Sequence, residues 1–292
     1  MMSPRRESPP RVVYYLEEVM GTVVVFDLYV KPSLERETLD SLVETARVTL
    51  HDADDLFSAW KPESPVSKLR RGVATLDDMP EDVLEVLTLC ASAREMSKGW
   101  FNPWAMPGGV DPTGYVKGWA AQRALRCLDH DGVVGAMVNA AGDIATRGSP
   151  GADVPFRIGI TDPRAQGRLA CVIDVQAAIA TSGTYERGQH LIDPFSGRPG
   201  ARASSASVVG PDLGVADALA TALAVAGRDF LELLEGVGDY EGLAFESDGS
   251  WTCTSRFPFA ANTLPASAAN VTSATERRGI AEILTRDLSA SA

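Results

Sequence analysis

The chain has 292 residues, of which 45% are hydrophobic and 23% charged, as in ordinary globular proteins. Its 27 basic and 39 acidic side chains leave a net charge of −12, which argues against nucleic acid or an anionic membrane surface as the main partner. No apolar run is long enough to predict a transmembrane helix. Four scattered cysteines show no metal-binding or redox spacing, which favours reduced thiols in a cytoplasmic protein.

We expect three regions along the chain. Residues 1–11 are expected to form a disordered leader and not a signal peptide, because the first ten contain two arginines with no apolar run behind them. Residues 12–259 alternate periodic apolar patterns with turn residues and are expected to form one compact unit. Residues 260–292 are rich in Ala, Ser and Thr and are expected to form a flexible tail, with at most one short helix near residues 280–288.

The first elements are predicted to be strands and then helices. β-branched and aromatic residues predict strands over 12–15 and 19–30, interrupted at Met20-Gly21-Thr22. Apolar residues at helical spacing predict amphipathic helices over 34–57 and 83–96. The segment between these helices, residues 57–69, is rich in turn formers and is predicted to be a loop. Within it, Trp60 could stack on a planar ligand or anchor the core, the commoner role of a tryptophan.

Residues 99–119 are dense in Gly, Pro and aromatic residues and lead into a helix that should end near Leu128. A glycine-containing turn at the start of a helix offers unpaired N–H groups and a positive dipole end, which suit a phosphate. Lys117, one turn into the helix, could reach an anion. Asp111, near the helix start, suits either a ligand contact or a simple helix cap.

The middle of the chain is predicted to be a series of short strands. Asp143 follows a break in the first of them and could hold a ligand hydroxyl or terminate a turn. The predicted strands cover residues 133–139, 144–146, 156–161, 169–175, 177–181 and 205–209.

The segment from Ala180 to Pro199 holds the densest set of reactive groups. Three hydroxyl residues surround Gly183, and His190, one of only three histidines, precedes an Asp-Pro-Phe-Ser-Gly turn. A histidine at the mouth of such a turn suits a site that orients a proton acceptor near a phosphate or hydroxyl. It equally suits a plain hairpin whose histidine caps a neighbouring backbone group, and residue chemistry alone leaves both interpretations open.

Residues 214–227 predict a helix that Gly227 ends. Asp217 and Thr221 are four residues apart and so share one face, roughly opposite the large apolar side chains. A carboxylate and a hydroxyl one turn apart can bind a hard cation such as Mg²⁺. Alternatively, Asp217 faces the helix dipole and Thr221 bonds its own backbone. The alanine-rich sequence favours the cation site, because small residues let another element approach closely.

The last elements are a helical stretch over 230–234 and a strand pair over 242–245 and 251–254, joined at Asp248-Gly249. Strands and helices alternate without a regular βαβ pattern. We therefore expect an α+β fold with mostly antiparallel sheets flanked by helices.

Taken in this order, the motifs resemble those of the ApbE family of FAD:protein FMN transferases. The strongest matches are residues 180–183, 190–199 and 216–223. Supporting matches are residues 20–22, 111–118 and 139–143. The resemblance runs from about Met20 to about Trp251.

The resemblance implies that FAD is the substrate and that a divalent cation, Mg²⁺, lies at its pyrophosphate. The implied cation ligands are Asp217, Thr221 and the backbone carbonyl of Gly114. His190 matches the histidine that supports proton abstraction, and Thr181 and Ser182 lie near the expected ligand path. The implied flavin contacts are Met20, Trp60, Trp100, Phe101, Asn102, Asp111, Lys117 and Ile192.

The implied reaction is the Mg²⁺-dependent transfer of FMN from FAD to a Ser or Thr hydroxyl of an acceptor protein, with release of AMP. Two alternatives stay open. In one, water replaces the hydroxyl, and the chain is an FAD pyrophosphatase that gives FMN and AMP. In the other it binds FAD without chemistry, which is motivated by Asn102, where the family usually has Asp, and by the short loop from Phe101 to Asp111.

Overall fold

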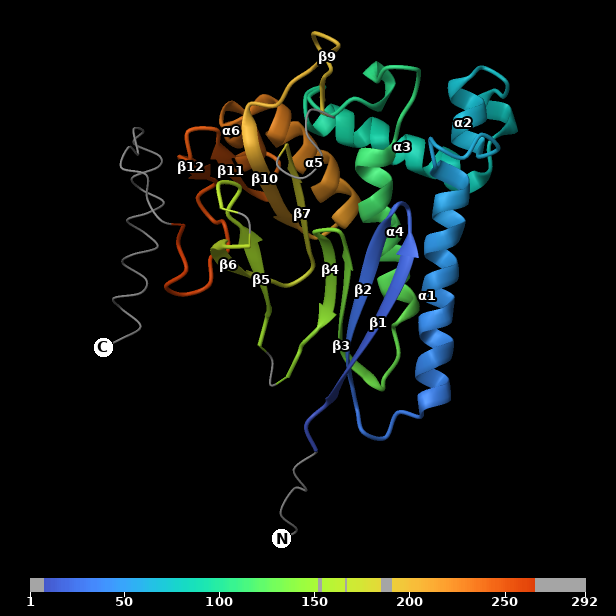
Figure 1. The fold of residues 1–292 in the computed structure, drawn as a ribbon, viewed down its shortest axis with the longest axis vertical. Coiled ribbons are helices and arrows are strands. Elements are labelled where there is room, and N and C mark those ends of the chain that lie inside the picture. Colours follow the sequence, from blue (N-terminus) through green and yellow to red (C-terminus); the bar gives the residue numbers. More distant parts are fainter. Residues whose placement is uncertain (1–7, 152–153, 166, 185–190, 266–292) are drawn as a thin grey trace.

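Eight strands form one antiparallel sheet in the order β1-β2-β3-β4-β7-β10-β11-β12 (Figure 1). The structure, a computed structural model, describes residues 8–151, 154–165, 167–184 and 191–265. The strands of the sheet are β1 (Arg11–Val19), β2 (Thr22–Val30), β3 (Val133–Ala140), β4 (Asp143–Gly148), β7 (Ala178–Gly183), β10 (Ala203–Gly210), β11 (Glu241–Glu246) and β12 (Trp251–Cys253).

Helices cover one face of this sheet and enclose the larger hydrophobic core. Figure 1 shows α4 behind β1–β3 and α1 beside it. The helices are α1 (Arg36–Phe57), α2 (Pro65–Arg70), α3 (Glu81–Met96), α4 (Thr113–Cys127), α5 (Leu213–Ala226) and α6 (Asp229–Glu235), with 3₁₀ helices η1 (Leu76–Asp78) and η2 (Pro103–Ala105).

A hairpin of β5 (Phe156–Thr161) and β6 (Leu169–Val175) encloses a second, smaller core with the opposite face of the sheet. Ile160 and Ile173 of the hairpin pack there with Ile144 and Ile179 of the sheet. The backbone N–H of Ala260 donates to the carbonyl of Val172, 2.9 Å away, so the chain returns to β6 after the last strand.

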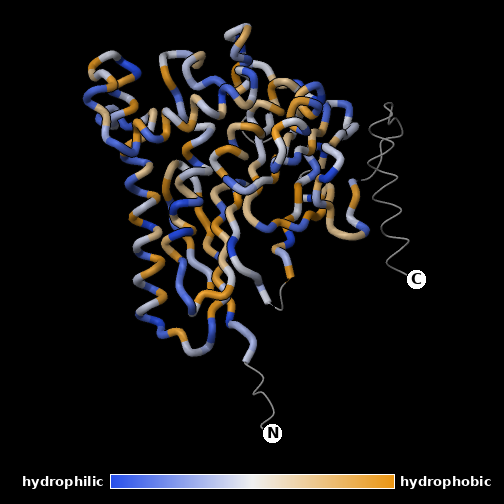
Figure 2. Tube along the Cα trace, turned by 180° about the vertical axis from the view of Figure 1, so that it is seen from behind, coloured by the Kyte–Doolittle hydropathy of each residue, from blue (hydrophilic) through white to orange (hydrophobic). Residues whose placement is uncertain are grey.

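Helix α1 shows how the sequence pattern produces this layering. Its buried residues recur at intervals of three or four, namely Leu39, Val43, Ala46, Leu50, Ala53 and Phe57. In Figure 2 the same helix alternates between hydrophilic and hydrophobic segments along its length. One face therefore packs against the core while the other faces solvent.

Helices α4 and α5 approach each other unusually closely, because two glycines lie at their contact. A methyl group on Gly118 would collide with the backbone of Leu213, whose carbonyl carbon would be 2.8 Å away. One on Gly214 would lie 2.7 Å from the ring of Tyr115. Only glycine fits at either position, and the close packing brings the start of α4 beside the middle of α5.

Two tight turns lie at the same end of the sheet. Met20-Gly21 joins β1 to β2 and Ala141-Gly142 joins β3 to β4, each with positive φ at both residues. This is the geometry of two-residue hairpins that follow the twist of the strands. The Asn139 side chain accepts a hydrogen bond from the backbone N–H of Gly142, 2.8 Å away, and stabilises the second turn.

The expectation of an α+β fold with a mostly antiparallel sheet and flanking helices is confirmed. One local prediction is wrong: residues 65–70 form α2, not loop, because Pro65 is at its first position and the Ser64 side chain caps Ser67. None of the helices in the described part of the chain combines the length and apolarity that crossing a bilayer requires. The division at residues 11 and 260 stays a prediction, and the helix expected over 280–288 lies outside the described residues.

Candidate active site

Asp143 links three elements of the fold at one end of the sheet. It is the first residue of β4, directly after the Ala141-Gly142 turn, and is fully buried. The Lys117 ammonium on α4 donates to its Oδ2, and the backbone N–H of Thr181 on β7 donates to its Oδ1 at 3.2 Å. Both carboxylate oxygens therefore already bond to the chain itself, so Asp143 does more than terminate a turn.

Asp217 lies on α5 with only 3% of its surface exposed. Its Oδ2 has no hydrogen-bond partner in the described part of the chain. Burial, and then the charge of Asp143 and a side-chain hydrogen bond with it, raise the pKa of Asp217 well above its ordinary value, while Lys117 and the Gly118 backbone N–H act against the shift. Since a buried unpaired polar oxygen typically costs about 1–3 kcal/mol, and more when charged, this carboxylate fits a bound cation or proton.

Two further groups lie beside Asp217. The Thr221 hydroxyl, one turn along α5, is 3.2 Å from the Ser182 hydroxyl on β7. A methyl group on Gly114, at the start of α4, would lie 3.5 Å from Thr221 Oγ1. The start of α4 and the middle of α5 therefore lie close together at Gly114 and Thr221.

We refer to Gly114, Lys117, Asp143, Ser182, Asp217 and Thr221 as the Asp217 cluster. Its potential ligands are a carboxylate, hydroxyls and a backbone carbonyl, which are the oxygen donors that Mg²⁺ prefers. Among the described residues, no group of three or more His, Cys, Asp or Glu side chains could hold a metal ion. A cation at Asp217 would therefore complete its coordination with water or with oxygens of a bound substrate.

Other predicted flavin contacts lie around η2 and the start of α4. Phe101 is buried, and its ring would be 3.4 Å from a methyl group on Gly114. Asn102 accepts from the Trp104 backbone N–H at 3.2 Å and so begins η2. Asp111 pairs with Arg70, 2.8 Å away, and also accepts from the hydroxyl of Thr113, the first residue of α4. Asp111 therefore holds the first residue of α4, while the N-cap position itself is occupied by Pro112.

The remaining predicted contacts differ in exposure. Trp60 is 94% exposed, so it does not anchor the core. Met20 lies in a hairpin turn at φ 53°, a sparsely populated region for a residue other than glycine. Ile192 is half-buried in β8 (Ile192–Asp193), which pairs with β9 (Arg198–Pro199). His190 lies outside the described residues.

Trp100 stands between an aromatic ring and a cation. Its ring meets that of Phe195 edge to face, with centroids 4.8 Å apart, and the Arg202 guanidinium lies 5.4 Å from its centroid. The sequence analysis did not name Arg70, Phe195 or Arg202 as individual site candidates. For Phe195, the available sequence signal was an aromatic residue at the tip of an Asp-Pro-Phe-Ser-Gly turn, where its side chain is exposed.

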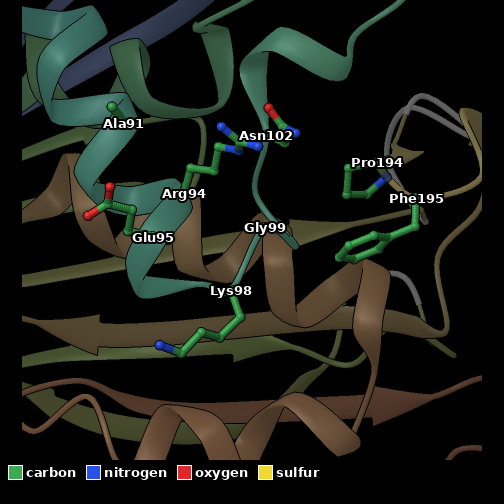
Figure 3. Close-up of a pocket in the computed structure, with 8 residues that line it drawn as sticks. All are labelled: Ala91, Arg94, Glu95, Lys98, Gly99, Asn102, Pro194 and Phe195. Atoms are coloured by element: carbon green, nitrogen blue, oxygen red, sulfur yellow. The ribbon is translucent and has the colours of Figure 1, made fainter.

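A pocket of about 530 Å³ opens between the end of α3 and the β8–β9 turn. Figure 3 shows the Phe195 ring pointing toward Gly99, and a methyl group on Gly99 would lie 3.5 Å from that ring. Asn102 is the one predicted site residue in its lining, which also includes Ala91, Arg94, Glu95, Lys98, Gly99, Pro194 and Phe195. None of the residues of the Asp217 cluster lines this pocket.

The fold is shared with solved flavin transferases. The flavin transferase ApbE from Vibrio cholerae has a TM-score of 0.71 at 20% identity, covering 84% of this chain and 97% of that one. The ApbE protein from Thermotoga maritima has a TM-score of 0.70 at 21% identity, covering 83% and 96%. These likenesses define the class of fold.

The sequence comparisons then define the family. The ApbE family model matches residues 105–243, which include all six residues of the Asp217 cluster. The chain is 34% identical over 208 residues to an FAD:protein FMN transferase of Rhodobacter capsulatus, covering 68% of this chain and 37% of that protein. It is 32% identical over 146 residues to one of Escherichia coli, covering 46% and 41%. The chain belongs to the ApbE family, and its matches cover about two fifths of these relatives' length.

Proposed function

We propose that this chain transfers FMN from FAD to a Ser or Thr hydroxyl of an acceptor protein and releases AMP. The observation that carries the proposal is Asp217, a buried carboxylate with one unpartnered oxygen beside the Thr221 hydroxyl and the start of α4. The family relatives named FAD:protein FMN transferase support it.

The chain offers two groups for the FAD pyrophosphate. The start of α4 presents the positive end of the helix dipole, which favours phosphate oxygens. The Lys117 ammonium, one turn further along, adds a full positive charge, and Asp143 fixes its position. Trp60, with its exposed indole face, and Trp100 are the proposed contacts of the isoalloxazine ring.

Asp217, Thr221 and the Gly114 carbonyl fit a hard divalent cation and would hold Mg²⁺. When bound there, Mg²⁺ would neutralise charge on the pyrophosphate and so favour attack at phosphorus.

The acceptor hydroxyl oxygen then forms a bond to the phosphorus of the FMN half, and the bridging bond to AMP breaks. The hydroxyl proton goes to His190, in the role that the family resemblance gives this residue. The product is a phosphoester between FMN and the acceptor, and nothing covalent forms on this chain.

We also propose that the reaction takes place in the cytoplasm. The free thiols of Cys90, Cys127, Cys171 and Cys253 support this location, because such thiols persist in reducing compartments. Cell fractionation followed by detection of the protein tests it.

The test of the reaction is incubation of the protein with FAD, Mg²⁺ and candidate acceptors, followed by detection of flavin fluorescence on the denatured acceptor. We expect a covalent adduct one FMN heavier by mass spectrometry, and none with Asp217→Asn. Asp27→Asn is the matched control, because Asp27 also has an unpartnered buried oxygen but lies on β2, outside the Asp217 cluster.

Two results would replace the proposal with another function. Release of FMN and AMP without any acceptor would identify a pyrophosphatase. Tight FAD binding that Asp217→Asn leaves unchanged, without any product, would identify a binding protein.

A further inference from the structure

Two buried carboxylates lie near Lys117, and its ammonium could compete with a divalent cation for either of them. Asp143 is fully buried and Asp217 is 3% exposed. The charges of both Lys117 and Asp143 act on Asp217. A lysine ammonium on a flexible four-carbon stem pairs readily with any carboxylate in reach. If Lys117 bonded to Asp217, it would occupy the oxygen that a divalent cation needs.

The bonds of Asp143 prevent this competition. Its Oδ2 accepts from Lys117, and its Oδ1 accepts from the backbone N–H of Thr181 at 3.2 Å. A backbone donor within a paired strand cannot move independently, so the carboxylate has a fixed orientation. Asp217 Oδ2, by contrast, has no hydrogen-bond partner among the described residues.

The fold leaves little freedom to this arrangement. Asp143 directly follows the two-residue turn at Ala141-Gly142, whose second N–H is held by Asn139. Lys117 is next to Gly118, where α4 contacts the backbone of α5. The lysine stem therefore starts from a fixed point and ends on a fixed carboxylate.

We propose that Asp143 is a positioning residue that holds the Lys117 ammonium away from Asp217 and so keeps Asp217 open to a divalent cation. This inference rests on the proposed function, because it assumes that Asp217 binds the cation.

The test follows the chemical reactivity of Lys117 together with Mg²⁺ affinity. The full-length protein is labelled with an amine-reactive ester, with and without Mg²⁺, and labelling of each lysine is measured by mass spectrometry. Lys117 is 24% exposed in its side chain and so is open to the reagent, while Lys31 and Lys61 serve as internal references. Mg²⁺ affinity is measured by titration calorimetry with the metal alone.

In the wild-type protein we expect Mg²⁺ to bind and the labelling of Lys117 to stay unchanged, because the ammonium is already on Asp143. In Asp143→Asn we expect Lys117 to move to Asp217. Mg²⁺ affinity should then fall about tenfold, which corresponds to the free energy of one charge-assisted hydrogen bond. Mg²⁺ should also increase Lys117 labelling, because it displaces the ammonium from Asp217. In Asp143→Asn/Lys117→Met the affinity should recover.

The labelling distinguishes positioning from a general effect of charge. If Asp143 acted only by its negative charge, its removal would weaken Mg²⁺ binding without making Lys117 labelling respond to Mg²⁺. That result would overturn the inference, as would unchanged affinity in Asp143→Asn, or a wild-type protein in which Mg²⁺ alters Lys117 labelling. The wild-type measurement stands even if Asp143→Asn fails to fold. If the wild-type protein binds no Mg²⁺, both the cation site and this inference fail. If the wild-type protein binds Mg²⁺ and Asp217→Asn does not, the cation site is supported whatever the result for Asp143.

Discussion

The Asp217 cluster and two exposed aromatic side chains of the same chain are built in opposite ways. In the cluster, Asp143 is fully buried and bonded on both oxygens, and glycines allow α4 to pack closely against α5. Trp60, by contrast, is 94% exposed, and Phe195 is 65% exposed at the tip of a turn. The difference indicates that positions for charge are fixed by the fold, while flat apolar surfaces stay open for a ligand to cover.

The largest effect should come from the cluster itself. Asp217→Ala removes the proposed cation ligand, and we expect FMN transfer to fall at least about 100-fold, as for the loss of a group that stabilises transition-state charge. Thermal stability should hold or rise, because the substitution removes a buried oxygen without a partner. Covalent flavin on the acceptor and a melting curve check both. A large drop in melting temperature with activity intact would mean that Asp217 is structural.

The close contact of α4 and α5 gives the next effect. Gly118→Ala places a methyl group against the Leu213 backbone, and we expect a loss of about 1–3 kcal/mol of unfolding free energy, as for overpacking a core. Chemical denaturation measures it. Gly200→Ala is the control, because no atom lies within 4 Å of its added methyl group. Equal stability of the two variants would show that the helices can separate without cost.

The exposed side chains should affect binding and not folding. Trp60→Ala removes no buried surface, so its unfolding free energy should stay within about 0.5 kcal/mol of wild type. Loss of a stacking face should weaken FAD binding by about 5–10-fold, measured by quenching of flavin fluorescence. Trp104→Ala, at a half-exposed tryptophan outside the predicted contacts, is the comparison. Identical FAD affinity in wild type and Trp60→Ala would remove Trp60 from the site.

The smallest effect concerns the β8–β9 turn that carries Phe195. The Phe195 backbone N–H and the Ser196 hydroxyl hold the pKa of Asp193 below its ordinary value. Because the pKa of Asp193 is lower in the folded protein, these hydrogen bonds contribute fully to stability above the unfolded pKa, near about 3.9. Their contribution disappears as the pH falls through the folded pKa. Asp193→Asn should therefore reduce thermal stability slightly at pH 7 and hardly at all near pH 2, measured by melting curves. A difference that grows at low pH would contradict this sign.

Sequence patterns predicted the regular elements well, because each carries its own periodicity. The predicted ranges of β5 and β6 agree with the structure at both ends, and the helix predicted over 214–227 is α5. The resemblance to the ApbE family, based on ordered motifs, is confirmed by the family match. Helix α2 was missed because six residues are too few to show a period, although its Ser-Pro start was readable.

The role of Asp143 was beyond local sequence. Its partners Lys117 and Thr181 are 26 and 38 residues away, and only the pairing of the strands brings them together. The exposure of Trp60 and the pairing of Asp111 with Arg70 depend on tertiary packing in the same way. For Gly114, Asp217 and Thr221 the motif pointed to residues that lie close together, and their role as ligands stays a prediction.

The Ala141-Gly142 turn has a consequence for how this hairpin can vary. Alternate residues of a strand point to opposite sides, so one residue inserted into the turn would rotate Asp143 out of the interior. Other side chains at positions 141 and 142 cost only backbone strain, whereas added length would remove the anchor of Lys117 altogether. The hairpin should therefore tolerate changes of residue type far better than insertions or deletions, although it lies in a surface turn where length usually varies freely.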